Sequence, residues 1–281
     1  MILVTGSEGF IGKRITERLD QLNLRHIRYD ITFGNDIRDE FQLSTIFESS
    51  SVDTIIHLAA ITRADESQLR EFISVNILGT EVLLNLAKKY DVRRIIAFSS
   101  SAVYGNQPGP QSETTPVEPI SLYGVTKVAM EMLCQKSGIP TIIVRPFSVY
   151  GENNSNDHII NIWMNRLKNN EPVPFYVGRI TDIKRGYTYV EDLIDGVIRI
   201  LSQTESFVGF EVFNLAGKGF VTLEELLRIF KFVYPELMVR YFPIPSSCPY
   251  ENWADIDNAE HLLGWKPKTN FEEKVREIIK K

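Results

Sequence analysis

A tyrosine and a lysine four residues apart carry the first sign of chemistry in this chain. Tyr123 and Lys127 stand in the stretch SLYGVTK, at the start of a predicted helix. Positions i and i+4 share one face of a helix, so we expect the phenol and the ammonium to be neighbours. An isolated tyrosine, with a pKa of about 10, needs roughly 4 kcal/mol of preferential phenolate stabilisation to become a base near pH 7. A nearby cation supplies stabilisation of that kind, which makes Tyr123 a candidate proton acceptor.

Three adjacent serines form a second candidate feature. They stand in FSSSAVYG (98–105), directly after an apolar run, and no acid lies among them. A serine cluster is often a capped, solvated turn. The alternative is that one of these hydroxyls takes part in catalysis beside Tyr123.

A glycine-rich turn follows the first apolar run. In MILVTGSEGFIGKRI, Gly6, Gly9 and Gly12 pass from a predicted strand into a predicted helix. In such a turn Gly6 permits the tight bend, Gly9 lets a pyrophosphate approach the backbone, and Gly12 lets the helix pack close to the sheet. The spacing GxxGxxG is one residue wider than the usual dinucleotide pattern. A purely structural turn is the alternative.

An acid ends the second predicted strand. Asp30 follows the glycines at the distance where a carboxylate accepts hydrogen bonds from both ribose hydroxyls of NAD and repels the 2′-phosphate of NADP. No arginine follows at once, since the next residues are Ile31, Thr32 and Phe33. We therefore expect NAD as the cofactor, with a plain solvated acid as the alternative.

Alternating elements must position these residues. Short runs rich in β-branched residues predict strands at Ile2–Val4, Arg25–Tyr29, Thr54–His57, Arg94–Phe98 and Thr141–Val144. Amphipathic patterns between them predict helices at Gly9–Leu22, Glu40–Phe47, Leu69–Tyr90 and Leu122–Lys136. Such alternation is typical of an α/β fold with a doubly wound parallel sheet covered on both faces.

The pattern changes after about Tyr150. Residues 151–157 and Lys168–Pro174 are predicted loops. Shorter elements follow at Val190–Leu201, Glu211–Leu215, Thr222–Val233 and near Phe271–Lys280, and Thr222 with Glu225 predicts a capping box. We predict a nucleotide domain over residues 1–150 and a smaller α/β substrate domain over 151–281. Some segments of the second should pack back on the first.

Bulk composition excludes several classes of protein. The net charge of -5 over 281 residues, with scattered basic residues, gives no reason to expect nucleic acid or an anionic membrane as a partner. Two cysteines far apart make no disulfide framework, no apolar run is long enough to span a membrane, and the N-terminus already reads as a strand. From these features we expect a cytoplasmic protein. We also expect no metal site, because the four histidines are scattered along the sequence.

A series of motifs carries a family resemblance. VTGSEGFIG, HLAA (57–60), FSSSAVYG, YGVTK, RPFSVYG (145–151), RGYTYVEDL (185–193) and DIDNAEHLLGWKP (255–267) occur in the order of one family. The chain resembles the extended short-chain dehydrogenase/reductase family, in its NAD-dependent sugar epimerase/dehydratase branch. The resemblance runs nearly end to end. It implies a Rossmann domain that holds NAD and a small C-terminal domain that closes over a nucleotide-sugar.

The same resemblance implies roles for individual residues. Tyr123 would take the sugar hydroxyl proton, Lys127 would bind the nicotinamide ribose and lower the pKa of Tyr123, and Ser100 would bind the same sugar oxygen. Implied cofactor contacts come from Gly6, Gly9, Phe10, Ile11, Gly12, Asp30, Asp36, Ile37, Leu58, Ala59, Ala60, Asn76, Ser99, Tyr123, Lys127 and Pro146. Implied substrate contacts come from Ser100, Ser101, Tyr123, Ser148 and Arg185.

The residues after the catalytic serine narrow the reaction. Dehydratases of this family carry an Asp-Glu pair there, whereas this chain has Ser101 and Ala102, which cannot protonate a leaving hydroxyl. The resemblance therefore favours epimerisation, most often at C4, with NAD returned unchanged. A 4-keto-sugar reductase that uses NAD(P)H and a non-catalytic dinucleotide sensor are the alternatives.

The substrate side departs from the family pattern. Arg185 matches an arginine that meets the nucleotide diphosphate, and bidentate binding suits a guanidinium. Ser148 stands where an asparagine is usual, and residues 242–255 lack a second arginine. Either Arg179 or Lys184 replaces that cation, or the substrate carries less charge. The helices at Leu69–Tyr90 and Leu122–Lys136 correspond to a four-helix dimer interface in relatives, so we expect a homodimer.

Overall fold

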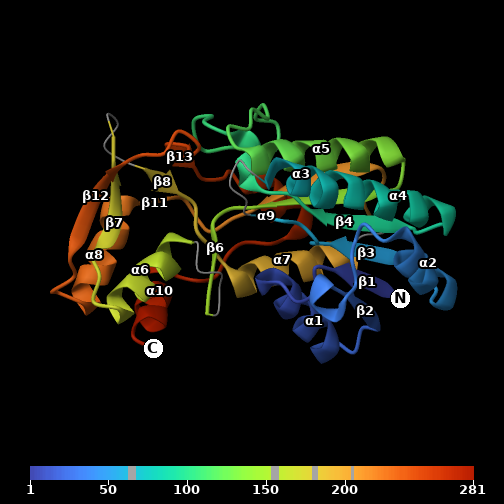
Figure 1. Ribbon diagram of the computed structural model, residues 1–281. Helices are drawn as coiled ribbons and strands as arrows, with labels where there is room; N and C mark the ends of the chain where they lie inside the picture. The colour runs from blue at the N-terminus through green and yellow to red at the C-terminus, as the bar shows by residue number, and fades with distance from the viewer. Residues whose placement is uncertain (63–67, 153–157, 179–182, 204–205) are drawn as a thin grey trace.

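Six parallel strands make the central sheet of the molecule (Figure 1). The computed structural model describes residues 1–62, 68–152, 158–178, 183–203 and 206–281. The strand order is β10-β5-β4-β3-β1-β2. The strands are β1 (Ile2–Thr5), β2 (His26–Tyr29), β3 (Thr54–His57), β4 (Arg94–Phe98), β5 (Thr141–Pro146) and β10 (Phe210–Leu215). The predicted α/β class and doubly wound parallel sheet are confirmed.

Burial on both faces explains why the apolar runs became strands. Every residue of β1, β3 and β4 is buried. Strands covered on both faces read as continuous apolar runs, which is the pattern that the sequence shows. The bounds of β3 and β4 match the predicted ranges, while Arg25 lies outside β2.

Helices cover the two faces of the sheet in separate layers (Figure 1). One layer holds α1 (Phe10–Gln21), α7 (Val190–Gln203) and α9 (Asp257–Leu263), which share a core with the sheet. The other holds α2 (Glu40–Ser49), α4 (Gly79–Lys89) and α5 (Leu122–Ser137) around Leu43, Leu83 and Met130.

The single helix predicted over Leu69–Tyr90 is wrong in one respect. The chain forms α3 (Leu69–Phe72), a π-helical turn η3 (Ile73–Leu78) and then α4. Periodicity did not reveal this because a π turn adds only one residue to a helix that otherwise continues. The turn places Asn76, which is 2% exposed, toward the end of the sheet that carries the predicted site.

A smaller core lies at the other end of the molecule. Trp163, Phe230 and Ile278 are buried in it. The elements around it are α6 (Ile159–Lys168), β7 (Val173–Val177), α8 (Leu223–Val233), β12 (Val239–Pro243) and α10 (Phe271–Ile279). The capping box of Thr222 and Glu225 is confirmed at the start of α8. The predicted loop Lys168–Pro174 is too long, because its first residue belongs to α6 and its last two residues belong to β7, which pairs with β12.

Several short elements complete the fold. They are the 3-10 turns η1 (Ile31–Phe33) and η4 (Ser101–Tyr104) and the strands β6 (Val149–Tyr150), β8 (Lys184–Arg185), β9 (Thr188–Tyr189), β11 (Val221–Thr222) and β13 (Glu251–Asn252). β10 joins the sheet beside β5 although it comes after residue 150. The division of the chain at residue 150 stays a prediction, and β10, α7 and α9 pack against the main sheet.

Two further features bear on the predicted class. Cys134 is buried, Cys248 is half-buried, and both are free thiols. Over the described residues, no helix combines the length and the apolar character needed to cross a membrane.

The close contact at Gly12 gives a test of the fold. A Cβ at this position would lie 2.1 Å from the carbonyl oxygen of Gly6 and 2.9 Å from Cα of Ser7. Gly12→Ala should therefore lower the free energy of unfolding by about 1–3 kcal/mol, because α1 must move off the turn. Urea unfolding measures the change. Gly9→Ala is the control, since the nearest atom there is 3.3 Å away; equal losses for both variants would contradict the argument.

Candidate functional site

Two cavities meet at the carboxyl ends of β1, β3 and β4. Their volumes are about 430 Å³ and about 540 Å³. Both are lined by Gly6, Gly9, Leu58 and Ala60, so they form one continuous cleft. The chain turns from β2 on one side of β1 to β3 on the other, and ligands of open α/β sheets bind at such a switch point.

The glycine turn leaves the backbone open to this cleft. Gly6 has φ +69°, and a Cβ there would lie 2.6 Å from the backbone nitrogen of Ala59. Gly9 is exposed at the start of α1, and the buried hydroxyl of Ser7 has no hydrogen-bond partner among the described residues. Free helix N–H groups and an open backbone fit the pyrophosphate of a dinucleotide such as NAD.

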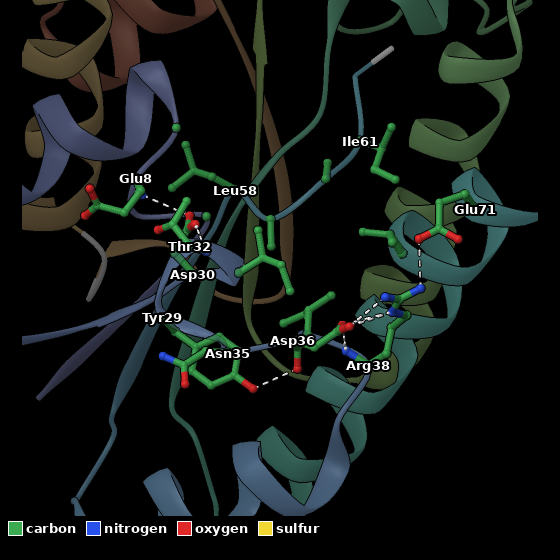
Figure 2. A pocket seen from close by; sticks show the side chains of 17 residues that line it. Glu8, Tyr29, Asp30, Thr32, Asn35, Asp36, Arg38, Leu58, Ile61 and Glu71 are labelled. Atoms are coloured by element: carbon green, nitrogen blue, oxygen red, sulfur yellow. Dashed lines mark hydrogen bonds and ion pairs between the residues drawn. The ribbon is translucent and has the colours of Figure 1, made fainter. Parts of the chain in front are cut away.

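Asp30 closes the outer end of the first cavity (Figure 2). The carboxylate is 8% exposed, and each of its oxygens accepts one backbone hydrogen bond, from Glu8 N at 2.9 Å and from Thr32 N at 3.0 Å. These bonds fix the direction of the carboxylate and leave each oxygen one further lone pair. The arrangement fits the two ribose hydroxyls predicted as its partners.

A charged network links two walls of the same cavity (Figure 2). The Arg38 guanidinium binds both carboxylate oxygens of Asp36 and donates from its third nitrogen to Glu71 at 2.9 Å. The hydrogen bond from Arg38 lowers the pKa of Asp36. The Tyr29 hydroxyl donates to the backbone oxygen of Asp36 at 2.8 Å. No sequence pattern indicated Arg38 or Glu71, because they are 33 residues apart and meet only in the fold.

The candidate catalytic residues line the second cavity. Tyr123 and Lys127 come from the first turns of α5, which Ser121 caps by accepting from Gly124 N at 3.1 Å. Lys127 is 5% exposed and donates from Nζ to the carbonyl oxygen of Phe98 at 2.8 Å. Its ammonium lies 5.7 Å from the centre of the Tyr123 ring. The expected neighbourhood of phenol and ammonium is present.

Burial sets the charge state of both groups. It raises the pKa of Tyr123 to about 12, and a hydrogen bond with Ser100 acts in the opposite direction. Burial also lowers the pKa of Lys127 to about 8, against the influence of Cys134 and Glu131. At neutral pH the protein alone therefore holds a phenol beside an ammonium. The lowering of the Tyr123 pKa by Lys127 stays a prediction.

Asn76 supports this site from beneath. Its side chain accepts from Ile61 N at 2.7 Å and donates to Ile61 O at 2.9 Å and to the Thr126 hydroxyl at 3.0 Å. The Thr126 hydroxyl donates to the backbone oxygen of Tyr123 at 2.8 Å. Asn76 is not among the lining residues of either cavity, so its predicted contact with the cofactor stays a prediction. What it does in this structure is hold the chain after β3 against α5.

His57 is buried between two threonines at the end of β3. Its Nδ1 lies 2.8 Å from the Thr5 hydroxyl and its Nε2 lies 3.0 Å from the Thr80 hydroxyl. Burial, and then the charge of Lys127, lower the pKa of His57 to about 3. The imidazole is therefore neutral at physiological pH, and it joins β1, β3 and α4 without adding a charge.

A buried ion pair fixes the other side of α5. Arg145 on β5 binds Glu131 through Nε at 2.9 Å and through a terminal nitrogen at 2.6 Å. Another nitrogen of Arg145 donates to the Tyr104 hydroxyl at 2.9 Å, which in turn donates to Asn214 on β10 at 2.7 Å. The helix that carries Tyr123 and Lys127 is thus tied to two strands of the sheet.

Ser101 is engaged in a contact that the sequence did not indicate. Its hydroxyl is buried and donates to Asn252 Oδ1 at 2.8 Å, and the Asn252 amide donates to the backbone oxygen of Ser101 at 3.3 Å. Ser101 lines the second cavity, but its hydroxyl is already hydrogen-bonded to Asn252 of β13. The position that holds an acid in dehydratases of the resembled family is therefore packed against an amide.

The candidate substrate cations lie beyond Ser148. Ser148 lines both the second cavity and a third, smaller cavity of about 170 Å³, which Arg185 also lines. The Arg185 guanidinium donates to Pro249 O at 2.6 Å and lies 2.9 Å from the sulfur of Cys248. Lys184 pairs with Glu251 at 2.8 Å, so an acid already holds this candidate for the second cation. Arg179, the other candidate, lies outside the described residues.

The structure brings nearly all the predicted residues together. Those that line the first two cavities are Gly6, Gly9, Phe10, Ile11, Gly12, Asp30, Asp36, Ile37, Leu58, Ala59, Ala60, Ser99, Ser100, Ser101, Tyr123, Lys127, Pro146 and Ser148. Arg185 lines the third cavity and Asn76 lies apart. Lining residues that sequence reasoning missed include Glu8, Thr62, Glu71 and His158. These four have no periodic or motif signal, apart from the position of Glu8 inside the glycine turn.

Known proteins resemble the whole chain. A family model described as "NAD dependent epimerase/dehydratase family" matches residues 2–216. The UDP-glucuronate 4-epimerase of Thermodesulfobacterium geofontis is 30% identical over 99% of this chain and 94% of its own length. The dTDP-D-glucose 4,6-dehydratase of Mus musculus is 26% identical over 99% of this chain and 87% of its own length. A structure of MoeE5 in complex with UDP-glucose and NAD is 25% identical, covers 99% of this chain and 97% of its own, and has a TM-score of 0.90.

The burial of His57 predicts how stability depends on acid. The pKa of His57 is about 3 in the folded protein and 6.5 in a free side chain, so the unfolded chain binds the extra proton between these values. As the pH is lowered through that window, the free energy of unfolding should fall. The slope should be steeper in the wild type than in His57→Gln, by up to about 1.4 kcal/mol per pH unit. Urea unfolding of both proteins from pH 8 to pH 4.5 tests this. Parallel pH curves would contradict it.

Proposed function

The chain belongs to the NAD-dependent epimerase/dehydratase family, and we propose that it inverts C4 of a nucleotide-sugar, with NAD held along the cleft from Asp30 to Lys127. The observation that carries the proposal is the meeting of Ser100, Tyr123 and Lys127 in the second cavity, which continues the cavity that Asp30 closes. A tyrosine placed to accept a proton beside a dinucleotide cleft suits the oxidation and re-reduction of an alcohol carbon.

Each of the three residues has a defined task in this proposal. NAD, when bound, supplies a hydride acceptor that can return the hydride, and its positive ring favours a phenolate. Tyr123 accepts the proton of the C4 hydroxyl and later returns it. Proton transfer by a positioned side chain typically raises the reaction rate by about 10²–10⁴-fold. Ser100, already hydrogen-bonded to Tyr123, binds the same sugar oxygen. Lys127, fixed to Phe98 O, holds its ammonium beside the phenol.

The surroundings of Ser101 favour epimerisation over dehydration. A dehydratase must protonate a leaving hydroxyl, and Ser101 and Ala102 carry no acid. Asn252 packs against Ser101, so no carboxylate stands at that point of the site. The 4-keto-sugar reductase remains the second candidate because it needs the same three residues. Purified protein that retains NAD and consumes no NADH during turnover would separate the epimerase from the reductase.

The nucleotide-sugar is proposed to extend from Ser148 toward Arg185. Both residues line the third cavity, which adjoins the catalytic one. Of the similar proteins described above, one is named for UDP-glucuronate, one is in complex with UDP-glucose, and the mouse dehydratase is named for dTDP-D-glucose, so UDP-sugars are the first substrates to test and dTDP-sugars the next. Incubation with UDP-, GDP- and dTDP-sugars, followed by NMR of the sugar protons, would show which stereocentre is inverted. A cytoplasmic location stays a prediction that rests on two free thiols.

We also propose a homodimer through α3, α4 and α5. These helices lie together on the outer face of one layer (Figure 1). Apolar side chains on α3, on the turn η3 that joins α3 to α4, and on α5 face solvent in the single chain: Leu69 43%, Ile73 39%, Leu78 49%, Val125 48% and Met132 58% exposed. Five apolar side chains on adjacent helices are more than scattered surface residues, and a second copy of the same face would cover them.

Removal of the Tyr123 hydroxyl tests the mechanism. Tyr123→Phe should lower kcat by about 10²-fold or more while NAD remains bound, because only the proton acceptor is lost. The measurement is turnover on the sugar that the NMR panel identifies, together with the NAD content of the purified variant. Tyr90→Phe, at a half-buried tyrosine outside the cleft whose hydroxyl donates to Glu48, is the control. Wild-type turnover of Tyr123→Phe would refute the proposed mechanism.

A charge on the exposed face of α5 tests the dimer. Met132→Lys should convert the dimer into a monomer at micromolar concentration, because the ammonium would be buried without a partner. Light scattering measures the mass. Phe41→Lys, at a residue that is 79% exposed on α2, is the control for added charge. A wild-type protein that is monomeric, or a Met132→Lys variant that stays dimeric, would rule out this interface.

A further inference from the structure

Glu8 stands inside the glycine turn and lines the cavity that Asp30 closes. It is the residue before Gly9, and its backbone N–H is the one that binds Asp30 Oδ2. Figure 2 shows the Glu8 side chain at the same end of the cavity as Asp30 and Thr32, away from Ile61 and Glu71. A ribose bound to Asp30 would therefore have Glu8 as its neighbour on one side.

The Glu8 carboxylate is mostly withdrawn from water. Its side chain is 17% exposed, and Oε1 is buried and accepts no hydrogen bond from the described parts of the chain. Buried carboxylate oxygens are normally hydrogen-bonded, and an exception calls for an explanation. Stability of the turn does not provide one, because the Glu8 backbone alone makes the bond to Asp30.

Two cations flank this carboxylate. Lys13 Nζ lies 3.4 Å from Oε2, and an Arg28 nitrogen lies 3.9 Å from Oε1. Both side chains are substantially exposed, and Arg28 also binds Asp20 at 3.0 Å. Lysine and arginine are the side chains that bind phosphates. By pairing with Lys13 and Arg28, Glu8 makes these two cations less available to a phosphate group.

We propose that Glu8 is a second determinant of cofactor choice, which excludes the 2′-phosphate of NADP by its own charge and by engaging Lys13 and Arg28. The inference rests on the proposed placement of NAD in this cleft, and it is independent of which sugar is epimerised. Asp30 binds the ribose hydroxyls directly, whereas Glu8 acts on the space next to them. The cavity as a whole is lined by four carboxylates, of Glu8, Asp30, Asp36 and Glu71, against the single guanidinium of Arg38.

Removal of the Glu8 charge separates these roles. Glu8→Gln keeps the size of the side chain, removes one negative charge and removes the carboxylate partner that Lys13 and Arg28 share, although Arg28 keeps its pair with Asp20. The affinity for 2′,5′-ADP should rise about tenfold relative to the affinity for 5′-AMP, because the phosphate loses an anion and gains two cations as neighbours. Asp30→Ala should instead weaken 5′-AMP, because it removes hydrogen bonds to the ribose. Calorimetric titration of NAD-free protein with the two nucleotides measures both ratios.

A variant of equal charge provides the control. Glu17→Gln changes the net charge by the same amount on α1, at an exposed residue that does not line the cavity. The salt dependence of the wild type is a second measurement that needs no variant. The ratio of the affinity for 5′-AMP to the affinity for 2′,5′-ADP should decrease as the NaCl concentration rises, because ions screen the repulsion between the carboxylates and the 2′-phosphate. The inference is overturned if Glu8→Gln and Glu17→Gln change the ratio equally, or if wild-type selectivity is independent of salt. Failure of wild-type protein to bind 5′-AMP would overturn the cofactor placement and this inference together, whereas an inactive sugar panel with intact 5′-AMP binding would affect only the proposed reaction.

Discussion

The contact between the backbones of Gly6 and Ala59 is the constraint on which the rest of the site depends. A Cβ at Gly6 would lie 2.6 Å from the Ala59 nitrogen, so β1 and β3 can deliver their ends to one point only with glycine there. The two cavities share this point. The positions of Asp30 at one end of the cleft and Lys127 at the other are therefore set by the sheet register and by the absence of a side chain at Gly6.

Desolvation dominates the chemistry at the other end of the cleft. It drives the pKa of Tyr123 up and that of Lys127 down, so both shifts favour the neutral forms of the two groups. Neutral His57 and the internally neutralised pair of Arg145 and Glu131 surround them without adding net charge. The protein thus provides a dry setting in which the Lys127 ammonium is the charge beside the phenol. In such a setting this ammonium and the charge of a bound cofactor would act on Tyr123 with little screening by water.

Features that depend on local sequence were predictable, and features that depend on long-range contacts were not. The bounds of β3 and β4, the capping box at Thr222 and the placement of Tyr123 beside Lys127 follow from neighbours within a few residues. The engagement of Ser101 by Asn252 joins positions 151 residues apart, and no pattern in either stretch announces it. The π-helical turn at Asn76 escaped for a different reason, because it changes the helical period by too little to disturb the apolar pattern.

The path of the chain between its two cores limits how the molecule can move and how it could have evolved. After β5 the chain enters the smaller core with α6 and β7, returns to the sheet with α7 and β10, leaves with α8 and β12, returns with α9 and ends in the smaller core with α10. Several connections therefore cross between the two cores, where a single linker would allow a free hinge. Rotation of one part against the other must deform all of these connections together. Exchange of the substrate-binding part between relatives would likewise need several matched junctions rather than one fusion point.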